Sequence, residues 1–136
     1  GGGATQIALA RRLRRFAETI PGREQLAIEA YAEALEVIPR ALAENAGQDA
    51  LGRLLELTAA QTSADSDWLG LDLESESISD MHEAGIREPI AVTRQAIKGA
   101  TDSAVSVLRI DDLLWAKQDP QIPEGVMEQL EGMGSA

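Results

Sequence analysis

The stretch GREQLAIEAYAEALEVIPRALAENAG, from Gly22 to Gly47, combines a long amphipathic helical pattern with a proline near its end. Its apolar side chains recur at the three- and four-residue spacing that places them on one face of a helix, while glutamates fall on the wetter side. The apolar positions are Leu26, Ala27, Ala30, Tyr31, Ala34, Leu35 and Ile38. This pattern predicts a long helix at the centre of a mainly α fold.

Pro39 interrupts this helical pattern. Proline has no N–H to donate to the carbonyl of Leu35, and its ring disfavours the α conformation at Ile38, so an interior proline costs a helix about 3 kcal/mol. The apolar stripe resumes after the proline, and Asn45-Ala46-Gly47 is typical of a helix end. We therefore expect the helix to kink or split at Pro39.

Helices are also predicted on both sides of this segment. The first runs from about Ala4 to Thr19 and ends at Pro21-Gly22. The next begins after Asp49, a residue type that favours the N-cap position, and its pattern continues to Gln61. The residues expected to face the core are Leu9, Leu13, Phe16 and Ile20 in the first of these helices and Leu51, Leu54, Leu55 and Thr58 in the second.

The second half of the chain changes character. Trp68 to Ser79 has the weak alternation of a short β-hairpin, with Leu71, Leu73 and Ile78 as candidate strand residues. A strong helical pattern starts at Pro89, which suits the first turn of a helix, and continues to Leu108. Arg109 to Trp115 fits either a continuation of that helix or a strand. Residues 117–136 are rich in proline, glycine and acidic residues, so we expect a flexible acidic C-terminal tail.

Composition argues against several classes of function. The 136 residues carry 23 acidic and 12 basic side chains, a formal charge of -11 that repels nucleic-acid phosphates and anionic membrane surfaces. No cysteine is present, which excludes disulfides and thiolate metal sites. No apolar run approaches the roughly 20 residues of a membrane span, and no export signal is visible. We expect a cytoplasmic protein without nucleic-acid or membrane partners, in a salt-adapted cytoplasm where salt screens its charge.

One acidic stretch has part of the pattern of a calcium-binding loop. Asp65, Asp67, Gly70 and Glu76 occupy the first, third, sixth and twelfth places of such a loop. The fifth place is Leu69, which offers no side-chain oxygen, so an ordinary acidic loop is preferred. His82 is the single histidine, and no cysteine or second histidine completes a zinc site or a nucleophilic triad. We predict no metal ligand and no catalytic residue.

Several segments of the chain together resemble one known family. They are Gly1-Gly2-Gly3-Ala4, the Gly22–Gly47 stretch, Gly85-Ile86-Arg87-Glu88-Pro89, Thr93 to Lys98, Ala100-Thr101 and Leu108 to Asp112. Their order and spacing are similar to those of the equatorial domain of group II chaperonins, the archaeal thermosome family. The resemblance implies that residues 1–116 are the helical C-terminal half of that discontinuous ATP-binding domain, with a small hairpin and a C-terminal strand at Arg109 to Trp115 that pairs at subunit contacts.

The resemblance also implies a set of ATP contacts. The implied residues are Gly2, Gly3, Asp72, Leu73, Ile86 and Glu88. The glycines would let the backbone approach the nucleotide, and Glu88 would accept hydrogen bonds from the ribose hydroxyls, while the other three residues would flank the adenine. Each position also has a purely structural interpretation. The glycines would then be a flexible linker or a cloning remnant, and Glu88 would be a helix cap. Asp72, Leu73 and Ile86 would have roles only in the packing of the hairpin and the core.

The chain contains no P-loop and no other glycine-rich loop with the polar residues that hold phosphate. In chaperonins that loop and the magnesium ligands precede the glycine triplet. We therefore expect ATP and Mg²⁺ to serve the full-length subunit, whereas this chain alone would hold neither tightly and would not hydrolyse ATP. The implied partners are the other subunits of a double ring and non-native client proteins. The alternative is a free-standing helical interaction module without nucleotide chemistry.

Overall fold

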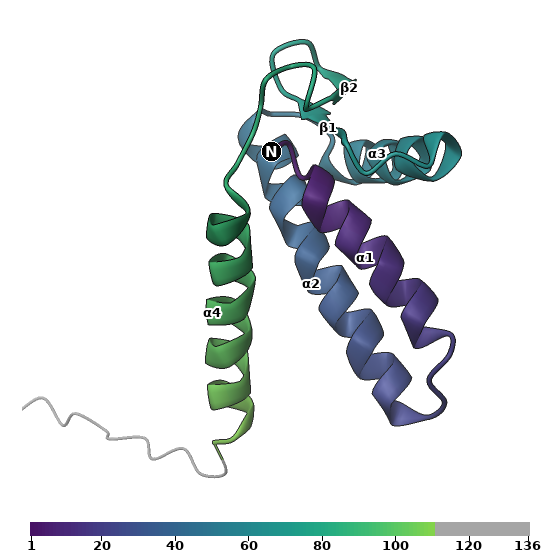
Figure 1. The fold of residues 1–136 in the computed structure, drawn as a ribbon, viewed down its shortest axis with the longest axis vertical. Helices are drawn as coiled ribbons and strands as arrows, with labels where there is room; N and C mark the ends of the chain where they lie inside the picture. Colours follow the sequence, from purple (N-terminus) through teal and green to yellow (C-terminus); the bar gives the residue numbers. More distant parts are fainter. Residues whose placement is uncertain (111–136) are drawn as a thin grey trace, which may run out of the picture. The chain divides into compact units, whose positions relative to one another are not determined.

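A computed structural model describes residues 1–110, and the chain divides into two compact units, Gly1–Arg94 and a second one that begins at Gln95. The elements are α1 (Ala4–Ala17), α2 (Arg23–Asn45), α3 (Ala50–Ala64), β1 (Leu69–Asp72), β2 (Ser77–Asp80) and α4 (Ile90–Leu108). In the first unit α1 and α2 lie side by side and run in opposite directions, joined by a short loop (Figure 1). The fold is therefore mainly α with one small hairpin, as the sequence predicts.

Small side chains bring α1 and α2 together. Ala4, Ala8, Ala10 and Ala17 of α1 and Ala32 and Ala43 of α2 are buried. Ile7 of α1 joins Ala43 in a core cluster with Leu54, Leu57 and Leu71. The predicted inward stripe of α1 is wrong, because Leu9, Leu13 and Ile20 are only half-buried and Phe16 is exposed. Alanine lets two helices approach closely, so the contact forms along the alanine face rather than along the face with larger side chains.

Pro39 does not split the second helix. α2 runs without interruption from Arg23 to Asn45, with Pro39 inside it. The proline is fully buried, and a Cβ placed on Gly3 would lie 2.6 Å from the Pro39 Cβ. The ring therefore packs directly against the backbone that precedes α1. Of the two expected outcomes, a kink or a split, the split is wrong because this packing offsets the hydrogen bond that proline cannot make, and the kink stays a prediction.

α3 begins after Asp49, which occupies the N-cap position with an extended backbone but makes no side-chain capping bond. Leu54 and Leu57 point into the core. Leu51 and Leu55, which the pattern placed inside, are exposed. A helix of this length buries only a narrow face, and the α3 pattern is apolar over a wider arc than the available neighbours cover.

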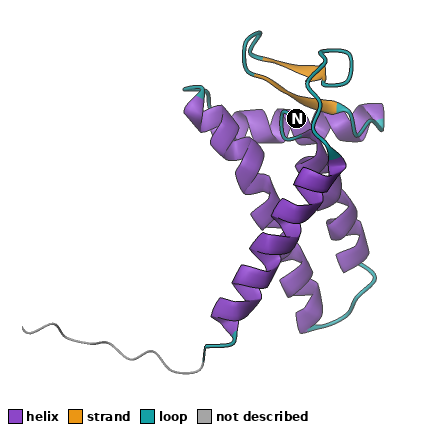
Figure 2. Ribbon diagram, turned by 60° about the vertical axis from the view of Figure 1, so that its left-hand side comes forward, coloured by secondary structure: helices purple, strands orange, loops and turns teal. Residues whose placement is uncertain are grey.

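The predicted hairpin is present. β1 and β2 are antiparallel, with Leu69 opposite Asp80 and Leu71 opposite Ile78 (Figure 2). Leu71 is buried and joins the core cluster, so the Leu71 side chain attaches β1 to the helices. Leu73 lies in the turn after β1 rather than in a strand, which corrects that part of the prediction.

α4 confirms the helix predicted from Pro89, with its first helical residue at Ile90. None of its residues is buried. Arg109 lies in a turn, where its N–H donates to the carbonyl of Val105. The described part of the predicted strand at Arg109 to Trp115 is not in a strand, and its remainder, like the predicted tail at 117–136, lies outside the described residues. Within residues 1–110, no helix has both the length and the hydropathy needed to cross a membrane.

Candidate functional site

The glycine triplet forms a tight turn that begins α1. Gly2 and Gly3 have φ angles of 61° and 75°, in the left-handed region that favours glycine. The Ala4 N–H donates to the carbonyl of Gly1, and the Gly3 carbonyl accepts from the N–H of Ile7. On the other side of the turn, the Gly2 carbonyl accepts a 2.8 Å hydrogen bond from the Leu71 N–H of β1. The triplet is thus a structured part of the fold and not a linker.

Close contacts surround the backbone of the triplet. A Cβ on Gly2 would lie 2.5 Å from the Met81 sulfur and 2.8 Å from the Leu71 carbonyl oxygen. A Cβ on Gly1 would collide with the side chain of Ile86. Glycine is therefore required by the hairpin and by the loop after it. This requirement comes from the protein's own packing. The same packing places the triplet next to the hairpin and the loop at Ile86, two of the segments implied to contact ATP.

Ile86 and β1 both contact the triplet, Ile86 at Gly1 and β1 at Gly2. The Ile86 N–H donates to the carbonyl of Met81, which holds the loop after β2 in place. Ile86 is 43% exposed and Leu73 is 37% exposed. The structure therefore brings Gly1, Gly2, Ile86 and the strand that leads to Leu73 into one region, with apolar side chains left partly open to solvent.

The carboxylate of Asp72 is used locally in the hairpin turn. Its Oδ1 atom accepts hydrogen bonds from the N–H groups of Glu74 and Ser75, at 3.0 and 3.2 Å. The Ser75 side chain, followed by the backbone N–H groups of Ser75 and Glu74, lowers the pKa of Asp72 below its ordinary value. Asp72 therefore shapes the turn that presents Leu73, and this explains its position without a ligand.

Glu88 lies in the exposed loop before α4. Its Oε2 atom accepts a 2.9 Å hydrogen bond from the hydroxyl of Thr93 in the first turns of that helix. This contact fits the helix-capping interpretation, because a carboxylate near a helix N-terminus is stabilised by the helix dipole. The side chain is also exposed and follows Ile86 by two residues, so a capping contact and a ligand contact are compatible.

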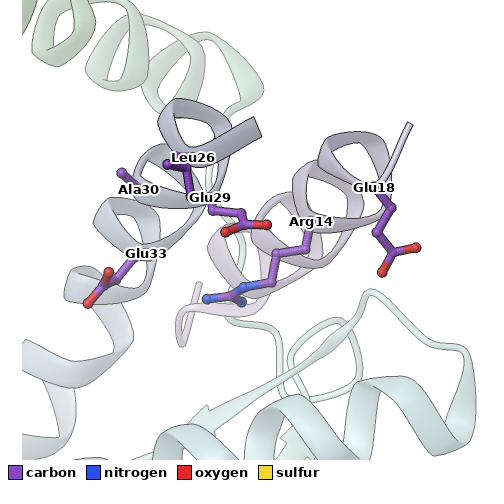
Figure 3. Close-up of a pocket in the computed structure, with 6 residues that line it drawn as sticks. All are labelled: Arg14, Glu18, Leu26, Glu29, Ala30 and Glu33. Carbon is purple, nitrogen blue, oxygen red and sulfur yellow. The ribbon is translucent and has the colours of Figure 1, made fainter. Parts of the chain in front are cut away.

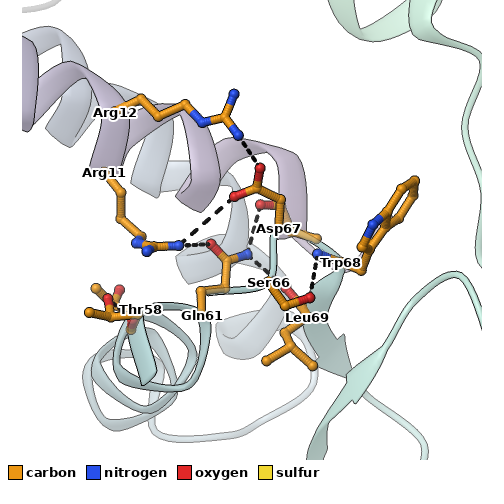
Figure 4. Close-up of polar contacts among 10 residues, drawn as sticks. Arg11, Arg12, Thr58, Gln61, Ser66, Asp67, Trp68 and Leu69 are labelled. Atoms are coloured by element: carbon orange, nitrogen blue, oxygen red, sulfur yellow. Dashed lines mark hydrogen bonds and ion pairs between the residues drawn. The ribbon is translucent and has the colours of Figure 1, made fainter. Parts of the chain in front are cut away.

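Gln61 lies where α3 meets the start of α1 and β1, and the sequence patterns did not single it out. It is fully buried, and its Nε2 atom donates to the carbonyls of Ala4 at 3.0 Å and Leu69 at 2.8 Å. Its Oε1 atom accepts from Arg11 Nη1 at 3.4 Å (Figure 4). The available signal was its spacing, because Gln61 follows Leu54 and Leu57 on the buried face of α3. A polar residue on such a face requires hydrogen-bond partners.

Two positions of the acidic loop after α3 have other structural roles. Asp67 forms ion pairs with Arg11 and Arg12 of α1, and Gly70 is part of β1. Among residues 1–110, no group of three acidic or histidine side chains is arranged to hold a metal ion. His82 is exposed and its ring lies at a tilt of 55° to the ring of Trp68, with ring centroids 5.2 Å apart.

A separate hollow of about 490 Å³ lies between α1 and α2, away from the triplet (Figure 3). It is lined by Arg14, Glu18, Leu26, Glu29, Ala30 and Glu33. The Arg14 guanidinium pairs with the carboxylate of Glu36, and this hydrogen bond raises the pKa of Arg14. The three carboxylates repel phosphate, and the one arginine is already paired with Glu36, so this hollow is a poor site for a nucleotide.

Comparison with known proteins defines the class. Residues 1–118 match the model of the TCP-1/cpn60 chaperonin family, and the chain belongs to that family. Among its relatives, the thermosome subunit beta of Methanothermobacter thermautotrophicus is 48% identical over 98% of this chain and 24% of its own length. The thermosome subunit of Methanocaldococcus jannaschii is 52% identical over 87% of this chain and 22% of its own length.

Solved structures agree with these sequence relatives. A group II chaperonin monomer from Methanococcoides burtonii in the open state has a TM-score of 0.77 and 43% identity, over 81% of this chain and 27% of that one. A group III chaperonin in the open state has a TM-score of 0.80 and 37% identity, over 84% and 23%. The chain therefore corresponds to part of a group II chaperonin subunit, and it spans about a quarter of the length of the relatives it matches. The alternative of a free-standing module is not favoured.

Proposed function

We propose that this chain is the part of an ATP-dependent archaeal chaperonin subunit that contacts the ribose and the base of the nucleotide. In the full-length subunit it also contributes surface to neighbouring subunits of a double ring, which assists the folding of non-native client proteins. The observation that carries the proposal is the hydrogen bond from the Leu71 N–H to the Gly2 carbonyl, because it joins the glycine triplet to the hairpin. Ile86 is linked to the same hairpin, since its N–H donates to the carbonyl of Met81 directly after β2.

The described residues suit one side of a nucleotide. The half-open side chains of Leu73 and Ile86 offer apolar surface for a base, and the exposed carboxylate of Glu88 offers acceptors for ribose hydroxyls. The proposal assigns them no phosphate contact, because Arg11, Arg12 and Arg14 are paired with carboxylates and residues 1–110 hold no metal-binding cluster. We propose that other parts of the full-length subunit hold the phosphates and Mg²⁺.

Titration of ATP into the full-length subunit tests the ribose contact. Glu88→Ala should weaken ATP binding by about 1.5 to 3 kcal/mol, because a hydrogen bond to a charged acceptor is lost. The saturated rate should change less if the contact is equal in the ground and transition states. Glu83→Ala, which removes an exposed acidic side chain from the same loop, is the matched control. Unchanged affinity of Glu88→Ala in an assembled ring would reduce Glu88 to a helix cap.

The chain by itself is proposed to bind ATP weakly and to be inactive. Phosphate and Mg²⁺ carry most of the charge that a nucleotide site must neutralise, and within residues 1–110 no group of acidic or histidine side chains is arranged to hold a metal ion. A phosphate-release assay should find no magnesium-dependent turnover. Turnover that Glu88→Ala abolishes would overturn this part of the proposal.

We also propose a salt-adapted cytoplasm as the working environment. The support is the charge of -11, because self-repulsion opposes the compact state and is screened within about 3 Å at 1 M salt, against about 30 Å at 0.01 M. The melting temperature should rise with KCl concentration. A melting temperature that stays flat from 0.01 to 1 M salt would contradict this proposal.

A further inference from the structure

The outer edge of β1 is covered by two groups from other elements, the carbonyl of Gly2 before α1 and the side-chain amide of Gln61 in α3. The carbonyl of Trp68 faces β2, where it accepts from the Met81 N–H. Backbone groups of alternate residues point to opposite edges of a strand, so Leu69 and Leu71 direct theirs away from β2. The Leu71 N–H donates to the Gly2 carbonyl, and the Leu69 carbonyl accepts from Gln61 Nε2.

A single amide group bridges this edge to the start of α1. Gln61 Nε2 carries two hydrogens and donates to both Leu69 and Ala4, the residue that directly follows the triplet. Two links therefore hold the triplet on β1 in parallel. One is the direct bond between Gly2 and Leu71, and the other runs from Ala4 through the Gln61 amide to Leu69.

The chemistry of the junction fixes the orientation of this amide. Both carbonyls are acceptors, so they require the NH₂ group, and the guanidinium of Arg11 is a donor only, so it requires the oxygen. Arg11 lies on α1 and is itself held near Asp67 at 3.9 Å. A leucine or methionine at position 61 would fill the space without donating, and an ionised glutamate would accept but not donate. Glutamine at position 61 is thus suited to join α3 to α1 and β1.

We propose that Gln61 is a positioning residue of the nucleotide site, which holds the glycine triplet in register on β1. The inference rests on the proposed function, because the triplet and the residues after β1 are the proposed contacts to the ribose and the base. Gln61 is fully buried in α3, and its amide is used by Ala4, Leu69 and Arg11, so the proposed role is to position the triplet rather than to contact the nucleotide. Its loss would let the triplet move relative to β1 while Ile7, Leu57 and Leu71 keep the core together.

The test uses the assembled full-length subunit with Gln61→Met and Gln61→Glu. Methionine keeps the volume and removes both donors, and glutamate keeps the acceptor for Arg11. Each variant should raise the KM for ATP about fivefold to tenfold, which corresponds to one or two lost hydrogen bonds, with kcat within about twofold. Gln25→Met is the matched control, because its amide donates to Glu29 on the surface of α2 and touches neither the triplet nor β1. It should leave both constants unchanged.

Hydrogen exchange of the unmodified ring provides a readout that needs no variant. Binding of ADP should slow exchange in the peptide that contains Leu69 to Asp72 more than in the peptide that contains α4, since the triplet and β1 are proposed to form one unit with the nucleotide. An unchanged KM in both Gln61 variants would overturn the role of Gln61. Equal slowing of exchange in the two peptides on ADP binding would instead contradict the proposed contact of the triplet and β1 with the nucleotide. If the unmodified ring binds no ATP at all, the proposed function fails first. If it binds ATP and only the Gln61 effects are missing, the proposed function stands.

Discussion

α3 and α4 have similar amphipathic patterns but very different burial. α3 has 15 residues and buries Leu54, Leu57 and Gln61 against α1, α2 and β1. α4 has 19 residues and buries none. An apolar stripe therefore predicts that a helix forms, but only a neighbouring element decides whether that stripe becomes core. In the first unit the neighbours are the alanine face of α1, the uninterrupted α2 and the hairpin.

Leucine truncation in the two helices should give the largest contrast. Leu57→Ala removes a fully buried side chain and should lower the free energy of unfolding by about 2 to 5 kcal/mol through lost burial and a cavity. Leu108→Ala removes a side chain that is 84% exposed and should change it by less than about 0.5 kcal/mol. Urea unfolding of the 136-residue chain measures both values.

Equal costs for Leu57 and Leu108 would break the comparison between α3 and α4. Repeating Leu108→Ala in the full-length subunit sharpens the comparison further. A cost there that is clearly larger than in the 136-residue chain would show that α4 packs against residues outside this chain.

Alanine at two left-handed glycines should separate backbone strain from packing. Gly2 and Gly47 have φ angles of 61° and 72°, so alanine is strained at both, by about 1 to 2 kcal/mol. Only Gly2 has near neighbours, whereas an added Cβ on Gly47 meets nothing within 4 Å. Gly2→Ala should therefore be less stable than Gly47→Ala by a further amount of about 1 to 3 kcal/mol. Equal melting temperatures would show that the triplet does not pack on β1 as described.

The smallest effect is expected at the hairpin turn, where the contacts are exposed. The folded-state pKa of Asp72 is lowered, so its ionised form adds stability above its ordinary pKa of about 3.9, and this stability is lost as the pH falls through the lower folded value. Asp72→Asn should be slightly less stable than the original chain at pH 7, and the difference should disappear on acidification below about pH 4. Urea midpoints across this range check it. A difference that persists in acid would mean that the turn does not depend on the charge.

Much of the fold follows from local sequence patterns. The helix from Ala4, the helix after Asp49, the hairpin and the helix near Pro89 were each predicted near their observed positions. The errors concern tertiary contacts. Pro39 stays within α2 because its ring is buried against Gly3. The inner face of α1 consists of Ile7 and alanines, which a search for large apolar side chains overlooks.

The candidate site was predictable only in part. The triplet and Ile86 were implied by the family resemblance, and the structure brings Gly1 into contact with Ile86. The role of Asp72 rests on local hydrogen bonds from the N–H groups of Glu74 and Ser75, which an aspartate in a turn typically accepts. The buried position of Gln61 depends on its contact with Ala4, a residue far away in the sequence. A pattern read along one helix cannot supply such contacts, although a glutamine on a buried face indicates that partners exist.

The most direct test of the proposed site is a density map of the full-length subunit with bound ADP and Mg²⁺. The proposal predicts ribose hydroxyls within hydrogen-bond distance of the Glu88 carboxylate, the base against Leu73 and Ile86, and the backbone of Gly2 and Gly3 facing the nucleotide. A nucleotide bound elsewhere, with Glu88 bonded only to Thr93, would contradict it.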